Sequence, residues 1–299
     1  MCSSDLSLAA LAAGANASSP ALRRSSRHAL ETLGQPVPPR RPTLQSWFGK
    51  APTIDGTLSP GEWSDATEIR GSLQWIPEFS PVTSVQDLNV VRGYVKHDDA
   101  WLYFAFQVHD DVLYGIDTPR WLPRENPRAH ELSRDGFPWF GDEMEILLNA
   151  SNTWRGDESA DGDGSSWQMV CNVTKSRLGG IGKGGLLEGE PRSDQAAWNT
   201  YNNWILQGAQ KAAVRVLSGR QKGYVIEWAV RFNPCVELKP GLFYSPDLGT
   251  VNVGLNIAVG DLDTPEKGAG NFGGFHHEQW WAGAPHTRTQ KDNFGTLQL

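Results

Sequence analysis

The chain has 299 residues, enough for one large domain or two small ones with a sizeable hydrophobic core. Its formal charge of −7 makes nucleic acids and anionic membranes poor partners. Thirteen tryptophans exceed what core packing alone needs and indicate a binding surface, while 32 glycines and 19 prolines favour a loop-rich, all-β protein.

The first part of the chain has the composition of a targeting segment followed by a linker. Residues 6–17 are small and apolar, and Ala15-Asn16-Ala17 matches an A-x-A cleavage site. The basic stretch that normally precedes such a run is missing. We therefore interpret residues 1–17 as a truncated signal peptide of a protein that is secreted, periplasmic or on the cell surface; the alternative is a disordered Ala-rich start.

Neither this run nor any later segment is long and apolar enough for a transmembrane helix. Residues 18–46 are rich in Ser, Pro and Arg and are typical of a flexible linker, with room for a short helix around residues 28–33. The folded domain is expected over residues 47–299.

Within that domain, short segments with alternating hydrophobicity predict strands rather than helices. In residues 101–108, for example, every second side chain is apolar and would share one face. The predicted strands are residues 90–95, 101–108, 143–148, 167–174, 212–217, 224–231, 251–259 and 294–299. Many short strands bounded by Gly, Pro, Asp and Asn predict an antiparallel β-sandwich of jelly-roll or immunoglobulin-like type.

Three long segments between the predicted strands are rich in aromatic residues. They cover residues 112–138, 176–203 and 261–292. Loops of this length in a compact domain are usually functional or disordered, and their aromatic content argues against disorder. We therefore expect binding residues in or beside them.

Residues 137–149 combine an aromatic ring with acids at the start of a strand. Alternation from Glu143 places Glu143 and Glu145 on one face, while Met144 and Ile146 point to a core on the other. Trp139 lies just ahead of this strand. A flat ring beside hydrogen-bonding carboxylates suits a sugar, which has an apolar C–H face and a rim of hydroxyl groups.

The two cysteines of the domain leave two alternatives open. Cys171 and Cys235 would form a disulfide in an oxidising compartment, or they are two buried thiols in a core. Spacing alone does not decide between them.

Several segments, in chain order, resemble family 9 carbohydrate-binding modules. Residues 52–66 resemble the opening "IDG…EW…A" signature, residues 97–111 the "YLY…V–D" strand, residues 139–148 the "W–DSVEIFID" segment, and residues 280–297 the final "W…FG–L" strand. The resemblance extends from about residue 50 to the C-terminus. It implies a calcium-binding β-sandwich that binds sugar and has no catalytic centre.

The resemblance also implies a sugar site. Two Trp rings of these modules clamp the sugar and a Glu bonds its hydroxyl groups; the matching positions are Trp139, Trp280 or Trp281, and Glu145. Gln168 and Asn172 share a face of the next predicted strand and would line the same site.

These residues favour a secreted protein that binds an oligo- or polysaccharide by Trp stacking, is associated with carbohydrate catabolism, and acts alone or with a separate glycoside hydrolase. The alternative is a structural or assembly subunit of the cell envelope that keeps the sandwich and has lost the sugar site. A departure from the family pattern supports this alternative, because Val170 stands where the resemblance implies a sugar-binding arginine.

Acidic residues near predicted turns are candidates for calcium ligands, since hard cations prefer carboxylate and carbonyl oxygens. The alternative is a set of solvated acidic turns, and the family's structural calcium favours the ion. The candidate ligands are Asp55, Asp98, Asp99, Asp110, Asp111, Asp142 and the acids of the loop at residues 157–164, which include Asp161 and Asp163.

Glycoside hydrolysis is the competing interpretation of paired carboxylates. Glu143 and Glu145 are two residues apart on one strand face, so their carboxylates would flank one spot. Retaining and inverting glycosidases need acids on both sides of the scissile bond. We therefore predict a binding protein and no enzyme.

Overall fold

The computed structural model describes residues 8, 10–11, 13–15, 20–35, 42–69, 76–78, 87–113, 142–150, 152, 166–173, 177–182, 210–233, 237–239, 241–261, 263, 277–282 and 294–299. Residues 8, 10–11 and 13–14 are helical, and the helices with described bounds are α2 (Pro20–Thr32) and the short 3-10 helix η1 (Pro246–Leu248). No helix among the described residues is long and apolar enough to cross a membrane.

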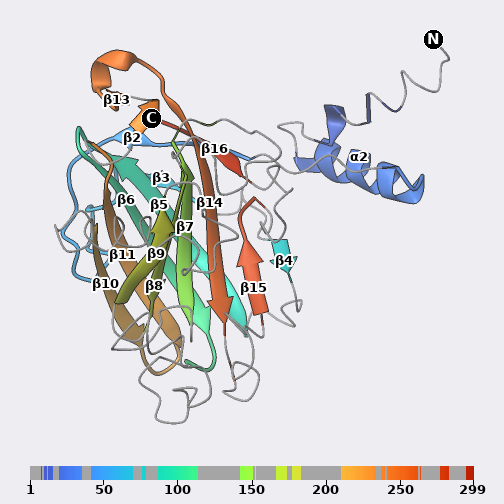
Figure 1. Cartoon of the computed structure of the whole chain (residues 1–299). Coiled ribbons are helices and arrows are strands. Elements are labelled where there is room, and N and C mark those ends of the chain that lie inside the picture. The colour runs from blue at the N-terminus through green and yellow to red at the C-terminus, as the bar shows by residue number, and fades with distance from the viewer. Residues whose placement is uncertain are drawn as a thin grey trace, which may run out of the picture.

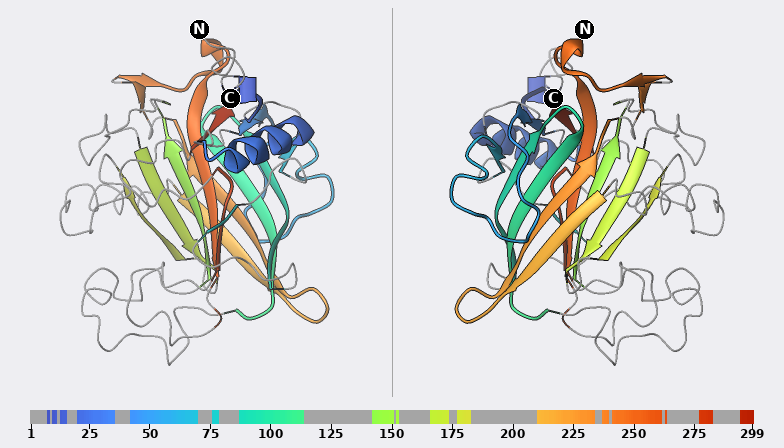
Figure 2. Two further views of the ribbon diagram at one scale, coloured as in Figure 1. Left: turned by 90° about the vertical axis from the view of Figure 1, so that its right-hand side faces the viewer. Right: turned by 90° about the vertical axis from the view of Figure 1, so that its left-hand side faces the viewer.

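Two β-sheets form the body of the described chain (Figures 1 and 2). Sheet A has eight described strands: β1 (Thr43–Gln45), β16 (Gly295–Gln298), β14 (Asn252–Asp261), β7 (Glu143–Asn149), β8 (Ser166–Asn172) and β9 (Arg177–Gly182) in that order, with β15 (His277–Trp280) beside β14 and β4 (Ile76–Glu78) beside β15. Sheet B has six: β10 (Gln210–Leu217), β11 (Gly223–Arg231), β6 (Trp101–Asp110), β5 (Leu88–His97) and β2 (Trp47–Phe48), with β3 (Thr67–Glu68) beside β5. A separate hairpin joins β12 (Glu237–Lys239) to β13 (Leu242–Phe243).

Most described strand pairs are antiparallel, and the two parallel pairs both involve the N-terminal segment. Strand β1 pairs in parallel with β16 of sheet A, and β2 pairs in parallel with β5 of sheet B. Residues 43–48 therefore pass from one sheet to the other, with Ser46 between the two strands. The predicted β-sandwich is confirmed.

The core lies between the sheets and follows the alternation seen in the sequence. On β7, Met144, Ile146 and Leu148 point into it; on β6 the inward side chains include Phe104 and Phe106. All five are at most 1% exposed. Burial of apolar side chains from one face of each sheet is the main stabilising term of such a sandwich.

The opening turn of the domain is attached to the outer side of sheet B by one buried carboxylate. Glu227 of β11 is 0% exposed, and its Oε2 accepts hydrogen bonds from the backbone N–H groups of Asp55 (2.9 Å), Gly56 (2.8 Å) and Thr57 (3.3 Å). Its Oε1 accepts from Trp63 Nε1 at 3.0 Å. Gly56 has φ +79, and a Cβ there would meet the backbone of residues 214 and 215. These contacts give the "IDG…EW" pattern a structural reason.

The described strands confirm the eight predicted segments and add others. Strand β9 lies inside the predicted loop 176–203, and β15 lies inside the predicted loop 261–292, so both segments are partly strand. The N-terminal part also differs from the predicted linker, because α2 occupies residues 20–32 and sheet A already includes Thr43. Cys171 is a free thiol buried in the core, while Cys235 lies outside the described residues.

Candidate functional site

The outer face of sheet A, opposite the core, carries most of the predicted sugar ligands that the structure describes. Glu145 of β7 is paired with Val170 of β8 on one side and with Ala258 of β14 on the other. Ala258 is in turn paired with Trp280 of β15. Because paired residues project to the same side of a sheet, Glu145 and Trp280 share one face, separated by the small side chain of Ala258.

Asn172 and the backbone of Gln168 belong to the same face. Asn172 is paired with Glu143, and Gln168 with Leu147, so each lies opposite a β7 residue of the outward set. The side chain of Gln168 is outside the described part of the structure, as is the whole of Trp139. The predicted sharing of a face by Glu145, Gln168 and Asn172 therefore agrees with the strand register.

The adjacent residues Trp280 and Trp281 lie on opposite sides of sheet A, and only one of them shares the outer face with Glu145. Trp280 packs with Leu147, Ala258 and Phe294 on the outer face. Trp281 is 0% exposed and belongs to the main core, where a Cβ on Gly295 would lie 2.7 Å from its ring. The prediction that Trp281 offers its ring to a sugar is wrong, because the core already covers that ring.

The outer face of sheet A is buried rather than open. Glu145 and Trp280 are each 3% exposed, and Asn172 is 0% exposed. In this structure the three side chains share one face of the sheet but are not on the molecular surface.

A second candidate site lies at one end of the sandwich, where three strands end or begin. Asp110 is the last residue of β6, Asp142 directly precedes β7, and Asp261 is the last residue of β14. All three are at most 1% exposed, and one carboxylate oxygen of each lies within 4.8 Å of the others. We call these three residues the inner aspartates.

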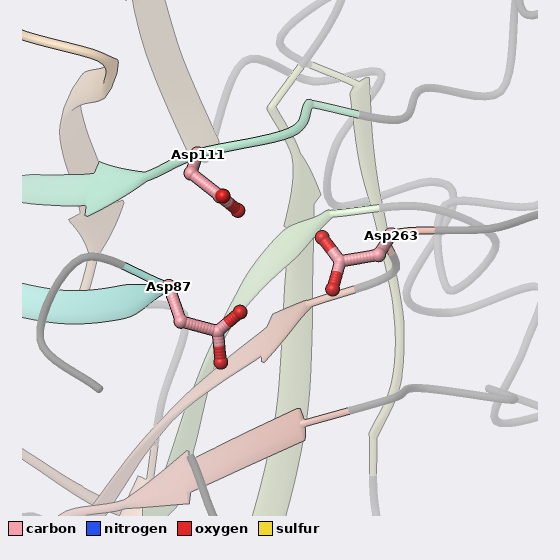
Figure 3. A group of neighbouring side chains, drawn as sticks. All are labelled: Asp87, Asp111 and Asp263. Atoms are coloured by element: carbon pink, nitrogen blue, oxygen red, sulfur yellow. The ribbon is translucent and has the colours of Figure 1, made fainter. Parts of the chain in front are cut away.

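Three further carboxylates, which we call the outer aspartates, form a similar group nearby. Asp87, Asp111 and Asp263 each offer an oxygen within 4.8 Å of the others. Figure 3 shows the three side chains converging on a common space from separate segments of the chain. Asp111 is exposed and the other two are half-buried.

Burial and mutual repulsion disturb the titration of the inner aspartates. Burial, followed by nearby acids including Asp263 and Asp111, raises the pKa of Asp110 to about 8. Burial, followed by Asp110 and the outer aspartates, raises the pKa of Asp261 to about 9. The cause is that a charged carboxylate is disfavoured both by loss of water and by like charges.

Tyr224 of β11 lies near enough to the inner aspartates for their negative charges to influence its titration. It is 0% exposed, and its hydroxyl oxygen has no hydrogen-bond partner among the described residues. Burial raises its pKa first, followed by the charges of Asp110, Asp142 and Asp261 and then of Glu143. A buried hydroxyl without a partner is costly.

The other predicted calcium ligands lie elsewhere. Asp55 Oδ1 accepts from Thr57 N at 2.8 Å in the opening turn. Asp98 Oδ1 accepts from the N–H groups of Ala100 and Trp101, both at 2.8 Å, and its Oδ2 accepts from Tyr103 at 2.6 Å. Asp161 and Asp163 are outside the described residues. Of the predicted ligands, the structure brings together Asp110 and Asp142.

Of the remaining members of the two aspartate groups, Asp111 was also a predicted ligand, whereas Asp87, Asp261 and Asp263 escaped the prediction. Asp87, Asp111, Asp261 and Asp263 flank strands, where an acid is also common in a solvated turn. The available signal was that strands β5, β6 and β14 each have Asp at or beside one end. Using it required the strand order, which the sequence alone did not provide.

The donor set of the aspartate groups fits a hard divalent cation. It consists of carboxylate oxygens, the ligands that Ca²⁺ prefers, and contains no thiolate or imidazole. Oxygen ligands of one Ca²⁺ ion lie about 2.3–2.6 Å from it, so they lie within about 5 Å of one another. Each group of three meets this condition separately.

No protein-family model and no curated protein matches this sequence. Among solved structures, the chain is similar to a family 9 carbohydrate-binding module from Caldicellulosiruptor kristjanssonii in complex with glucose, with TM-score 0.50 and 14% identity over 86% of this chain and 95% of that one. The same module in complex with cellotriose gives TM-score 0.49 over 86% and 93%. At this identity the likeness concerns the fold, and it confirms the β-sandwich that the sequence resemblance implied.

Proposed function

We propose that this chain is a carbohydrate-binding protein whose site is the outer face of sheet A. The observation that carries the proposal is the row formed by Glu145, Ala258 and Trp280, with Asn172 on the same face of the adjacent strand. An indole ring offers an apolar surface to the C–H groups of a sugar, while carboxylate and amide groups bond its hydroxyls. The similar fold of a module that holds glucose supports this choice of ligand.

Trp139 and Gln168 complete the proposed site. Trp139 precedes β7 by four residues and would supply a second ring beside Glu145; Gln168 lies opposite Leu147 in the strand register. Glu145, Asn172 and Trp280 are buried, so a sugar would reach them only after a conformational change that exposes them. We therefore expect slower association than at an open aromatic platform.

Binding without catalysis is the activity that this arrangement supports. Glu143 and Glu145 project from the same face of one strand. They cannot lie on opposite sides of a glycosidic bond, as a glycosidase mechanism requires. The protein would act on polysaccharide through a separate glycoside hydrolase and be exported to the cell surface or beyond.

Calcium is the second part of the proposal. We assign at least one structural Ca²⁺ ion to the aspartates at the strand ends, where it would stabilise both sheets. The ion would supply positive charge to carboxylates that the fold otherwise buries against one another.

Calorimetric titration of the full chain with cello-, xylo- and manno-oligosaccharides tests sugar binding. Glu145→Gln keeps the side-chain volume and removes the charge, so we expect at least about tenfold weaker binding. Trp139→Ala tests the second ring, with a similar expected loss. Trp47→Ala is the matched control, because Trp47 is 57% exposed on β2 of sheet B, and its affinity should equal that of the unaltered chain.

The same titration decides the alternative of an envelope scaffold without a sugar site. The burial of Glu145, Asn172 and Trp280 favours that alternative, since polar residues can be retained for packing alone. A folded, calcium-stabilised chain that binds none of the three sugar classes would establish the scaffold and refute the binding proposal.

A further inference from the structure

The formal charge of the chain is unevenly distributed along its length. Residues 18–46 contain five arginines and one acid, for a formal charge of +4. Residues 47–299 contain the other 22 of the 27 basic residues and 32 of the 34 acidic ones, for a formal charge of −10. The overall charge of −7 therefore hides a basic N-terminal segment attached to an acidic sandwich.

Helix α2 carries most of this positive charge, and its sequence puts that charge on one side. Successive residues of an α-helix are about 100° apart, so Arg23, Arg24 and Arg27 fall within an arc of about 100°. Leu22 and Leu33 are three turns apart and share another side, about 140° from the centre of the arginine arc. The helix is thus basic on one side and apolar on another.

The two leucines of the apolar side face solvent. Leu22 is 52% exposed and Leu33 is 57% exposed. Leu33 follows α2 directly, and its N–H donates to Ala29 O at 3.0 Å, so it continues the helical turn. Leucines of a helix in a soluble domain normally face a core, and an exposed pair beside a basic side indicates a contact surface.

The helical residues before α2 pack against a different part of it. A Cβ on Gly14 would collide with the hydroxyl group of Ser26, which is itself 4% exposed. Ala15 is 0% exposed, and its N–H donates to Leu11 O at 2.9 Å. Figure 1 shows α2 outside the two sheets of the sandwich. Neither sheet therefore includes the exposed leucines in its core.

We propose that α2 docks on the surface of an anionic phospholipid membrane, with Leu22 and Leu33 entering the headgroup region and the arginines attracted to the lipid phosphates. Amphipathic helices with basic residues lie in the membrane interface in this way, and clusters of four to eight basic residues are attracted to anionic lipids. The thirteen residues of α2 extend about 20 Å, less than the hydrocarbon core of about 30 Å, so the helix lies on the membrane.

The charge of the sandwich sets its position during docking. With a formal charge of −10, residues 47–299 are repelled by the surface that attracts α2. The sandwich is therefore held in solution beside the membrane, and its own sites stay accessible. The leucines and arginines of the docking surface follow residue 17, so the surface is independent of the expected removal of residues 1–17 and of sugar or calcium binding.

Co-sedimentation of the full chain with phospholipid vesicles tests the electrostatic part. We expect binding to vesicles that contain phosphatidylglycerol, little binding to phosphatidylcholine alone, and loss of binding in about 1 M salt. Arg23→Gln with Arg27→Gln should weaken binding roughly 25-fold, since each basic residue near an anionic surface contributes about fivefold. Arg220→Gln, in the exposed turn between β10 and β11, is the matched charge control and should leave binding unchanged.

Leu22→Gln tests the apolar part and should weaken binding roughly tenfold. Leu248→Gln is its control, because Leu248 is 42% exposed on η1. All these variants alter residues outside the strands, so an unchanged melting temperature of the sandwich verifies their folding. Failure of the folded chain to bind phosphatidylglycerol vesicles, or equal losses in variants and controls, would overturn the proposal. So would a dimer formed without vesicles and dissociated by Leu22→Gln, because a second copy would then cover the leucines.

Discussion

Two buried carboxylate environments in this sandwich differ in how their charge is compensated. Glu227 receives four N–H donors, three from the opening turn and one from Trp63. Asp261 is as deeply buried and has no described donor, and other acids surround it. Both pKa values are raised, chiefly by burial, but at Glu227 the donors oppose the rise, whereas at Asp261 like charges add to it.

The difference separates a structural anchor from a ligand site. A carboxylate that accepts hydrogen bonds from the backbone holds a turn in place and needs nothing more from solution. A carboxylate buried among others is stabilised only by a proton or a cation. The same residue class thus has opposite roles in sheet B and at the strand ends, and substitutions should have opposite signs.

The largest change in stability is expected on substitution of Glu227. Glu227→Ala leaves the N–H groups of Asp55, Gly56 and Trp63 without their acceptor, so the free energy of unfolding should fall by roughly 3–5 kcal/mol. Denaturant unfolding followed by Trp fluorescence measures it. Glu62 is the control in the same turn, because it accepts from Thr53 N (2.6 Å) and Ser59 N (3.3 Å) where water can replace it.

Glu62→Ala should cost about 1 kcal/mol. Equal losses for the two variants would show that the burial of Glu227 adds nothing to its role.

A smaller effect of opposite sign is expected at Asp261. In chelator, the unaltered chain must bury a charge or take up a proton at this position on folding, whereas Asp261→Asn does neither. The variant should therefore be more stable than the unaltered chain by roughly 1–3 kcal/mol without calcium, and less stabilised by added calcium. Thermal unfolding with and without calcium gives both quantities.

Destabilisation of Asp261→Asn in chelator would instead identify Asp261 as a structural hydrogen-bond acceptor like Glu227. That result would remove the contrast between the two environments.

The strands that could be predicted from the sequence are those with a regular alternation of apolar and polar side chains. Residues 101–108 have an apolar side chain at every second position, and these side chains (Leu102, Phe104, Phe106 and Val108) lie in the core as expected. Strand β9 was missed because RLGGIG has little side-chain pattern, and β1, β2 and β3 were missed because two or three residues carry no period. These strands are defined by their partners rather than by local sequence.

The candidate sites show the same limit. Alternation was enough to put Gln168 and Asn172 on one face of their strand and Glu143 and Glu145 on one face of theirs, because both strands are regular. It could not choose between Trp280 and Trp281, since adjacent residues face opposite sides and the phase of β15 depends on its pairing with β14. The aspartate groups join residues more than 100 positions apart, and only the strand order brings them together.

His97 provides an intermediate case, in which a buried titratable group is satisfied as a neutral species. Its Nδ1 lies 2.9 Å from Ser46 Oγ and its Nε2 lies 2.9 Å from Tyr244 Oη, so one ring bonds the N-terminal crossover segment and the segment before η1. Burial lowers its pKa, against the smaller opposing effects of Asp98 and Asp99.

The sign of the pH dependence follows from that shift. The unfolded chain, with an ordinary His pKa of about 6.5, binds a proton more readily than the folded chain, so stability is full above that pH and falls as the pH drops below it. The contribution of His97 to the free energy of unfolding should be the smallest of the predicted effects. Measuring the free energy of unfolding against pH for the unaltered chain and for His97→Gln, and taking the difference, isolates this contribution. A difference that does not change between pH 7.5 and 5 would mean that His97 keeps its ordinary pKa on folding, and the contrast between balanced and unbalanced buried groups would then be confined to the carboxylates.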